Sequence, residues 1–426
     1  IQRFAMLMNI QNTAKRPTSP HPILNLGFRI FFVGSAVFAV ISMLLWLVIL
    51  QGFAPFQGVV TPFYWHGHEM VFGYALAVIA GFLLTAVKTW TNQPMPYGWH
   101  LGAIFGAWAV SRFIWFGLHV TPSIALFMAA FVFDMIFWGM TAFAVIKAVW
   151  AVRQKRQIGI ITKLLLLGLT QVAFYVGVLI NHHNTQQIAL YFALYLVIGV
   201  VFTIARRVLP FFITKGISVN HDGTPNGMQL EQKNSDLLDR LNLFGFFGFI
   251  IFDLFIKQPM IAGVCALVCL MANLARLKNW YHHAIWQKPL LWSLIIAFFG
   301  MTISLAMFVL YPIATQLNWF SSVNIHTLGL HGLAVFGIGL MTIAMMARVS
   351  LGHTGRNIHQ PPATVSLMFM LMILCGIFRV VLPLFFNDSY MPLMLLSQVL
   401  WIASFVIFCL CYVGILVKPR TDGLFG

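Results

Sequence analysis

Charge is scarce in this chain of 426 residues. Only 8% of the residues are charged and just nine are acidic, whereas a soluble domain carries about a quarter charged residues. Hydrophobic residues make up 60% of the sequence, and the mean hydropathy is +0.89. This balance excludes an ordinary soluble protein and predicts an all-α, polytopic membrane protein.

Cysteine and long polar stretches are also scarce. The five cysteines all fall inside apolar stretches, where they are interpreted as small helix residues rather than as disulfides or thiolate ligands. Most connecting segments are short, so no separate soluble domain is expected. The sequence therefore predicts one bundle of helices.

Twelve apolar stretches are each long enough to cross a hydrocarbon core of about 30 Å. We predict spans at about 28–50, 65–87, 101–119, 122–147, 163–181, 188–209, 241–257, 259–277, 290–311, 325–347, 363–386 and 391–417. The predicted organisation is an N-terminal tail (1–27), a single transmembrane domain (28–417) with a polar loop at 210–240, and a C-terminal tail (418–426).

The net charge of +16 is distributed unevenly between the loops. Lysine and arginine gather on alternate loops, while the intervening loops carry only Lys257 and Asp388. By the positive-inside rule, both termini and the 210–240 loop are cytoplasmic. The lipid bilayer explains the basic surplus, and a nucleic-acid partner is not expected.

Seven of the fourteen histidines fall at the outer end of the predicted spans. They are His66, His68, His119, His182, His183, His326 and His331. Imidazole is costly to place near hydrocarbon, so a one-sided set predicts a shared ligand or metal site.

The second span opens with His66, His68 and Glu69. Residues two apart on a helix lie about 200° apart, so the two imidazoles face opposite directions, unless the helix begins only at Glu69 and lets them converge. A purely structural interpretation is that these histidines lie at the membrane interface beside a tryptophan of the aromatic belt. An acidic residue entering the membrane needs a partner, which favours a functional role.

The tenth span carries His326 and His331, about 140° apart. His331 lies deeper in an apolar run and is either a hydrogen-bonded core residue or a ligand. The second and tenth spans are also rich in small residues, so we expect both helices to be central and to allow a helix or a flat ligand to approach closely.

Three further histidines and one buried charge pair are the remaining candidates. The adjacent His182 and His183 are candidate copper ligands, or simply solvated residues of a polar turn, and His119 in a tight turn is interpreted as structural. Arg112 and Asp134 lie part-way through neighbouring spans and are expected to pair as a neutral buried unit.

On the opposite side, the tenth span ends in Arg348-Val-Ser-Leu-Gly-His-Thr-Gly-Arg356. Arg348, Gly352, His353 and Arg356 form a motif whose donors suit a carboxylate or a phosphate. Alternatively, part of this motif is explained as a cytoplasmic basic loop in which Gly352 ends the helix.

The strings Trp65-His-Gly-His-Glu-Met-Val-Phe-Gly-Tyr74 and Arg348 to Arg356 resemble the NnrS family, and the likeness covers nearly the whole chain. The resemblance implies a bacterial inner-membrane protein of about twelve spans that binds haem and copper and serves the response to nitric oxide and nitrosative stress. It carries over His66, His68, Glu69, His326 and the four motif residues Arg348, Gly352, His353 and Arg356. For His331, His182 and His183, the expected ligand roles rest on position alone.

By analogy, the twelve-helix subunit of haem-copper oxidases and nitric oxide reductases also carries haem-ligating histidines on its second and tenth helices. We expect haem, of b type, with axial ligands from His66 or His68 and from His326 or His331, copper at His182 and His183, and nitric oxide or iron-nitrosyl species as ligands. The alternatives are a twelve-helix secondary transporter with a central cavity, or a haem or metal trafficking factor without turnover. Whether the protein is an enzyme stays open.

Overall fold

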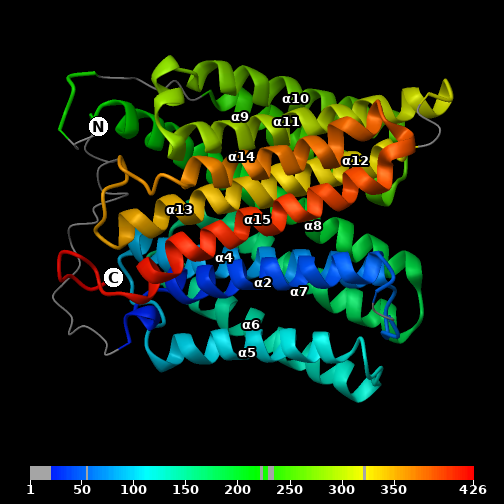
Figure 1. Cartoon of the computed structure of the whole chain (residues 1–426), viewed down its shortest axis with the longest axis horizontal. Coiled ribbons are helices and arrows are strands. Elements are labelled where there is room, and N and C mark those ends of the chain that lie inside the picture. The colour runs from blue at the N-terminus through cyan, green and yellow to red at the C-terminus, as the bar shows by residue number, and fades with distance from the viewer. Residues whose placement is uncertain (1–20, 54–55, 221–223, 229–234, 320–322) are drawn as a thin grey trace. The chain divides into compact units, whose positions relative to one another are not determined.

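The computed structural model describes residues 21–53, 56–220, 224–228, 235–319 and 323–426. These residues are almost entirely helical (Figure 1), and outside the helices their backbone pairing as sheet is limited to one isolated bridge between Val219 and Pro225. The all-α prediction is therefore confirmed. The predicted N-terminal tail falls mostly outside the described residues.

Ten helices among the described residues are long and apolar enough to cross a membrane, as expected of a multi-pass membrane protein. The third and seventh predicted spans correspond to α5 (Trp99–Gly117) and to α9 (Asp236–Ile250) with the π-helical segment η4 (Ile251–Phe255), and neither is among these ten. The reason is their polar content, because α5 contains Arg112 and α9 begins on acidic and basic residues. The predicted count of twelve spans stays a prediction.

The chain divides into two compact units. The first comprises the chain up to Val197 together with Met346–Arg356 and Phe408–Gly426, and the second comprises Ile198–Met345 and Asn357–Ile407. In the first unit, α2 (Gly27–Leu50) packs on the continuous helix formed by α3 (Pro62–His68), π-helical η2 (Glu69–Ala75) and α4 (Leu76–Thr91). Helix α5 packs on α6 (Ile124–Ala151), which also contacts α4 and α7 (Ile158–Leu179).

In the second unit, α10 (Pro259–Trp280) packs between α9 and α11 (Pro289–Gln316). Helix α11 also contacts the continuous helix formed by α12 (Ile325–Gly332), π-helical η6 (Leu333–Leu340) and α13 (Met341–His353), whose last residues belong to the first unit. Helix α14 (Val365–Gly376), which continues into π-helical η7 (Ile377–Val381), packs against η6. Helices α8 (His183–Ile217) and α15 (Tyr390–Val417) each contribute residues to both units.

Local sequence signals explain where several helices begin and end. Thr61 caps α3 by accepting a hydrogen bond from the Tyr64 amide, and Pro62 occupies the first turn, where its missing N–H costs nothing. Asn92 and Asn181 end α4 and α7 with positive φ values of 53° and 52°, a conformation that asparagine tolerates well. Helix α8 continues through Pro210 to Ile217, so the polar connection that was predicted over 210–240 begins later than expected.

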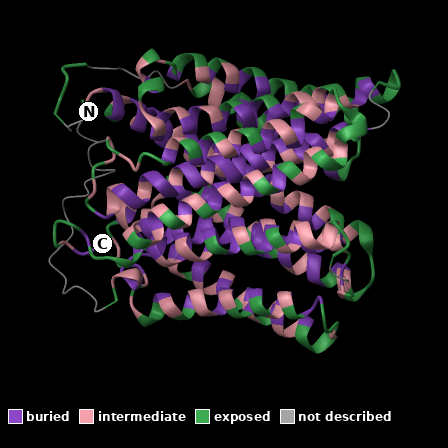
Figure 2. Ribbon diagram, in the orientation of Figure 1, coloured by how far each residue is buried: buried purple, intermediate pink, exposed green. Residues whose placement is uncertain are grey.

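The expectation that the second and tenth spans are central is confirmed by burial. In Pro62–Thr91 and Ile325–His353, 83% of the most apolar window is buried, more than in the other candidate spans, and Figure 2 shows buried residues along α13. Their glycines bring helices together. A Cβ on Gly81 would lie 2.7 Å from the Phe31 Cβ of α2, and one on Gly332 would lie 2.2 Å from the Ser304 hydroxyl of α11. The glycines at these positions therefore allow neighbouring helices to pack closely.

Candidate functional site

The continuous helix α3–η2–α4 sends its two histidines in opposite directions. Since α3 already begins at Pro62, both His66 and His68 lie on helix, and the interpretation in which they converge is wrong. The His66 ring stacks on Trp46 of α2, with centroids 4.5 Å apart and planes within 10°. His68 instead points into the first unit and has no exposed surface.

His68 lies in a closed aromatic environment. Four rings surround it, at centroid distances of 4.4 to 5.6 Å, from Phe72, Trp115, Phe174 and Tyr175. Its Nδ1 hydrogen-bonds Glu69 Oε1 at 2.8 Å. Its Nε2 makes no hydrogen bond to any described residue and lies 3.8 Å from Asp134 Oδ2. His68 therefore has one nitrogen fixed by a carboxylate and one nitrogen without a hydrogen bond.

Arg112 of α5 ties two buried carboxylates together. Its guanidinium bonds Glu69 at 2.5 Å and also Asp134 of α6, and all three side chains are almost fully buried. The second Asp134 oxygen accepts a hydrogen bond from the Tyr175 hydroxyl at 2.7 Å. The Arg112–Asp134 pair was predicted from the sequence and is present, and Glu69 joins it, so that one cation faces two acidic side chains. The expected neutrality of this unit stays a prediction, because it depends on the protonation of Glu69.

We name His68, Glu69, Arg112, Asp134 and Tyr175 the buried charge cluster. With both carboxylates ionised and His68 neutral, the cluster has a net charge of −1. Burying an uncompensated charge is costly, so the cluster is complete only with one additional positive charge. A proton on His68 or on one of the two carboxylates supplies it, and so does a cation of unit charge bound at His68.

Three π-helical segments each contain a charged residue. Glu69 opens the π-helical segment η2, Asp253 lies in η4 and Arg379 lies in η7. Such π-helical turns occur often at functional sites, because they re-aim side chains within an otherwise regular helix. Hydrophobic periodicity carries no signal for π-helical segments, so none of these was predicted from the sequence.

In the second unit, the two histidines of α12 have separate partners. His326 Nε2 hydrogen-bonds Asp253 of η4 at 2.9 Å. His331 uses both ring nitrogens, Nδ1 with the Thr327 carbonyl at 2.8 Å and Nε2 with the Arg379 guanidinium at 3.1 Å. His331 thus matches the alternative of a hydrogen-bonded core residue. A guanidinium at Nε2 occupies the position that a metal ion would take.

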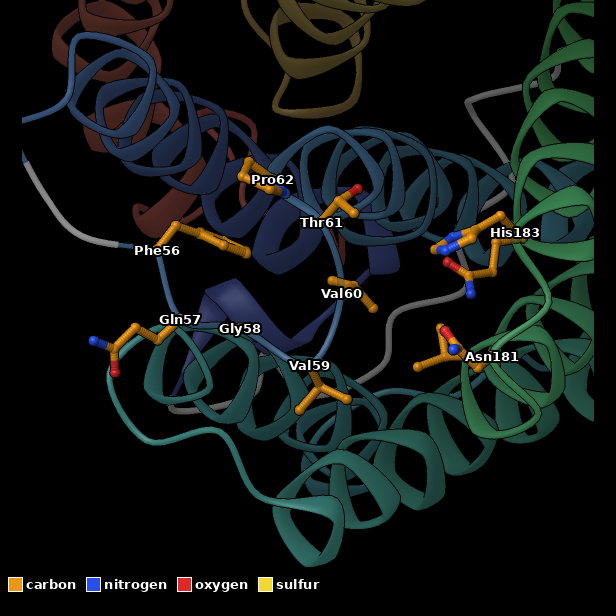
Figure 3. Close-up of a pocket in the computed structure, with 11 residues that line it drawn as sticks. Phe56, Gln57, Gly58, Val59, Val60, Thr61, Pro62, Asn181 and His183 are labelled. Carbon is orange, nitrogen blue, oxygen red and sulfur yellow. The ribbon is translucent and has the colours of Figure 1, made fainter.

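His182 and His183 lie at the exposed turn between α7 and α8. His182 Nδ1 pairs with the Thr185 hydroxyl at 2.7 Å, and the His183 side chain lines a cavity of about 400 Å³. Figure 3 shows His183 and Asn181 on one side of this cavity and the segment 56–62 opposite them. Among the described residues, no group of three or more His, Cys, Asp or Glu side chains is placed to hold a metal ion.

His119, interpreted from sequence as structural, lies in a more unusual environment. It is 6% exposed, and neither ring nitrogen makes a hydrogen bond to a described residue. The edge of its ring packs on Trp65 at 4.5 Å, and Phe56 lies 4.7 Å away. A histidine in a turn beside a proline gave no sequence signal of burial, because Phe56 and Trp65 are distant in the chain.

The motif Arg348–Arg356 contacts the C-terminal segment 418–426. Arg420 donates to the His353 carbonyl at 2.9 Å, and the Thr421 hydroxyl donates to the Gly355 carbonyl at 2.8 Å. Helix α13 continues through Gly352, so the glycine stop was placed too early; Gly355, with φ of +74°, makes the turn. Arg348 is buried. The backbone carbonyls of His353 and Gly355 thus accept hydrogen bonds from this segment.

These observations define a class: a multi-pass helical membrane protein whose first unit encloses a histidine within a buried cluster of charges. The family model described as NnrS protein matches residues 22–420, nearly the whole chain. The chain belongs to the NnrS family. No curated protein matches it.

Proposed function

We propose that this protein binds haem through His68 in the bacterial inner membrane and, with copper, serves the response to nitric oxide. The observation that carries the proposal is the environment of His68. A metal-ligating histidine usually donates its second ring N–H to a carboxylate, which fixes the ring and raises its basicity, and Glu69 occupies that place at 2.8 Å from Nδ1.

The charge of the cluster supports the same proposal. The buried charge cluster lacks one positive charge, and ferric haem, in which a dianionic porphyrin holds Fe³⁺, contributes a net charge of +1 at the iron. Cu⁺ carries the same charge. A cation bound to His68 Nε2 therefore neutralises the two carboxylates that Arg112 alone leaves with an excess of one.

Haem fits the described residues better than an isolated copper ion does. Haem iron needs only one or two protein ligands, whereas a copper site built on histidines needs two or three together. No such group of three occurs among the described side chains. Because His68 has no exposed surface, a macrocycle reaches Nε2 only if at least one surrounding ring, such as Trp115 or Phe174, moves.

When bound, haem would supply an iron that takes nitric oxide as a ligand. The protein's own contribution is to exclude water with the aromatic cage, to orient the His68 imidazole through Glu69, and to hold a proton near Asp134 or Glu69. In the second unit, His326 has the same pairing with a carboxylate, and we propose it as a second candidate ligand. His66, His182 and His183 remain weaker candidates, and copper is assigned to no particular residues.

The proposal is tested on the purified full-length protein, expressed with added haem precursor and copper. We expect a reducible haem absorption spectrum with iron in the same sample, and its loss in His68→Ala. His100→Ala removes an exposed histidine of α5 that is not a candidate ligand and is the matched control, which should keep the spectrum. A wild-type protein without haem or iron, or a His68→Ala variant with an unchanged spectrum, contradicts the proposal.

The buried charge cluster also supports the second candidate, a proton-coupled transporter, since a cluster that is complete with one proton can load and release it. This candidate predicts no bound haem, and proton uptake by protein in vesicles that depends on Glu69 and Asp134. Iron analysis of the purified protein therefore distinguishes the two candidates directly.

A further inference from the structure

A second cavity of about 530 Å³ lies in the first unit, between α2 and the end of α5. Ile41, Leu45 and Ile49 line one wall, four residues apart along a single face of α2. Phe116 and Val120 complete its apolar lining. Ile41 is 45% exposed on the apolar surface of α2, so the cavity opens where a molecule dissolved in the bilayer can enter.

His119 and Gln57 are the polar residues in the lining of this cavity, which contains no Lys, Arg, Asp or Glu among the described residues. His119 is more than nine-tenths buried, and both of its ring nitrogens lack a hydrogen bond to a described residue. Buried polar atoms in proteins are nearly always hydrogen-bonded, so this histidine requires an explanation. Neither nitrogen has accessible surface in this arrangement, so the imidazole must turn toward the cavity before a ligand there can bond it. A ligand that offers hydrogen-bonding atoms then provides the missing partner.

The lining selects the ligand by chemistry. An acyl chain would fill the apolar wall but would leave the nitrogens of His119 without a partner. A phosphate or a carboxylate would bring a charge into a cavity that has no opposing cation. A neutral ring that carries carbonyl or hydroxyl oxygens can pack against the apolar wall and also hydrogen-bond His119. The cavity volume lies within the range of about 300 to 1,000 Å³ that is typical of small-molecule sites.

We propose that this cavity binds the headgroup of a membrane-dissolved quinone or quinol, with His119 hydrogen-bonded to a ring oxygen. His119 packs on Trp65, one helical turn before Glu69, so the headgroup would lie beside the buried charge cluster. The site stands on its own lining residues and does not depend on haem at His68.

The test measures equilibrium binding of a radiolabelled short-chain benzoquinone to the full-length protein in phospholipid nanodiscs. His119→Phe keeps a ring but removes both nitrogens, and Leu45→Trp fills the cavity while leaving His119 in place. His100→Phe, an exposed histidine near the other end of α5, is the matched control. We expect saturable binding in the wild type and in His100→Phe, and binding at least tenfold weaker in the other two variants.

The infrared carbonyl band of a ¹³C-labelled benzoquinone provides a readout of the hydrogen bond itself. It should shift to lower frequency on binding to the wild type, and the shift should be absent in His119→Phe. Absence of saturable binding, or equal binding in all variants, would overturn the proposal. The proposal would also be overturned if His119→Phe and Leu45→Trp lost bound haem while quinone binding stayed unchanged, because the cavity would then be a haem site.

Discussion

Replacing Arg112 by methionine tests the buried charge cluster as a structural unit. The substitution keeps much of the side-chain volume but removes the single cation that bonds both Glu69 and Asp134. Breaking a buried pair by deleting one partner costs about 3 to 5 kcal/mol, because a charge is left uncompensated. At about 2 to 4 °C per kcal/mol, this loss corresponds to a fall in Tm on the order of 10 °C.

The assay is thermal unfolding of the purified protein in detergent, followed by tryptophan fluorescence. Lys155→Met removes an exposed cation from the loop after α6 and should change the unfolding free energy by less than about 0.5 kcal/mol. The triple variant that combines Arg112→Met with Glu69→Gln and Asp134→Asn removes the carboxylate charges as well and should recover part of the loss. Equal Tm values for Arg112→Met and Lys155→Met would refute the reasoning.

Two further predictions concern packing and the C-terminal segment. In Gly27→Val, the new Cβ meets the Leu84 Cβ at 2.6 Å, and we expect a loss of about 1 to 3 kcal/mol in the free energy of unfolding. Gly106→Ala, inside α5 with open space around it, should cause no loss, because alanine is the better helix former. Hydrogen bonds from Arg420 lower the pKa of Asp422 to about 2. A carboxyl with a depressed folded-state pKa stabilises above its unfolded value of about 4 and loses that contribution as the pH falls toward 2. Rate-corrected hydrogen exchange at residues 420–424 should therefore speed up over that pH window, and a pH-independent rate, or the same dependence in Asp422→Asn, would contradict this assignment.

Those features that depend on helical periodicity and charge could be predicted from the sequence. The opposed directions of His66 and His68 follow from the geometry of one helix, and the pairing of Arg112 with Asp134 follows from two charges at similar depth in consecutive spans. The centrality of the second and tenth spans follows from their glycines. All of these features depend on residues within one helix or on residues of two consecutive helices.

The features that escaped prediction depend on contacts between distant segments or on departures from regular geometry. Glu69 joins Arg112 across 43 residues, and His331 meets Arg379 across 48 residues. The π-helical turns shift side chains away from the positions that a 3.6-residue period assigns. The burial of His119 depends on aromatic residues from two other segments, and the contacts of the Arg348–Arg356 motif depend on a C-terminal segment more than 60 residues away.

The most direct test of the central claim is the haem affinity of Glu69→Gln, measured by titrating the haem-free full-length protein and following the haem absorption band. If Glu69 orients His68 as an iron ligand, haem should still bind, with an affinity reduced about 10- to 100-fold, as is typical when a carboxylate behind a ligating histidine is lost. Asp236→Asn, which removes an exposed carboxylate at the start of α9, should bind haem like the wild type. An unchanged affinity in Glu69→Gln, together with unchanged binding in His68→Ala, would show that His68 is not the ligand.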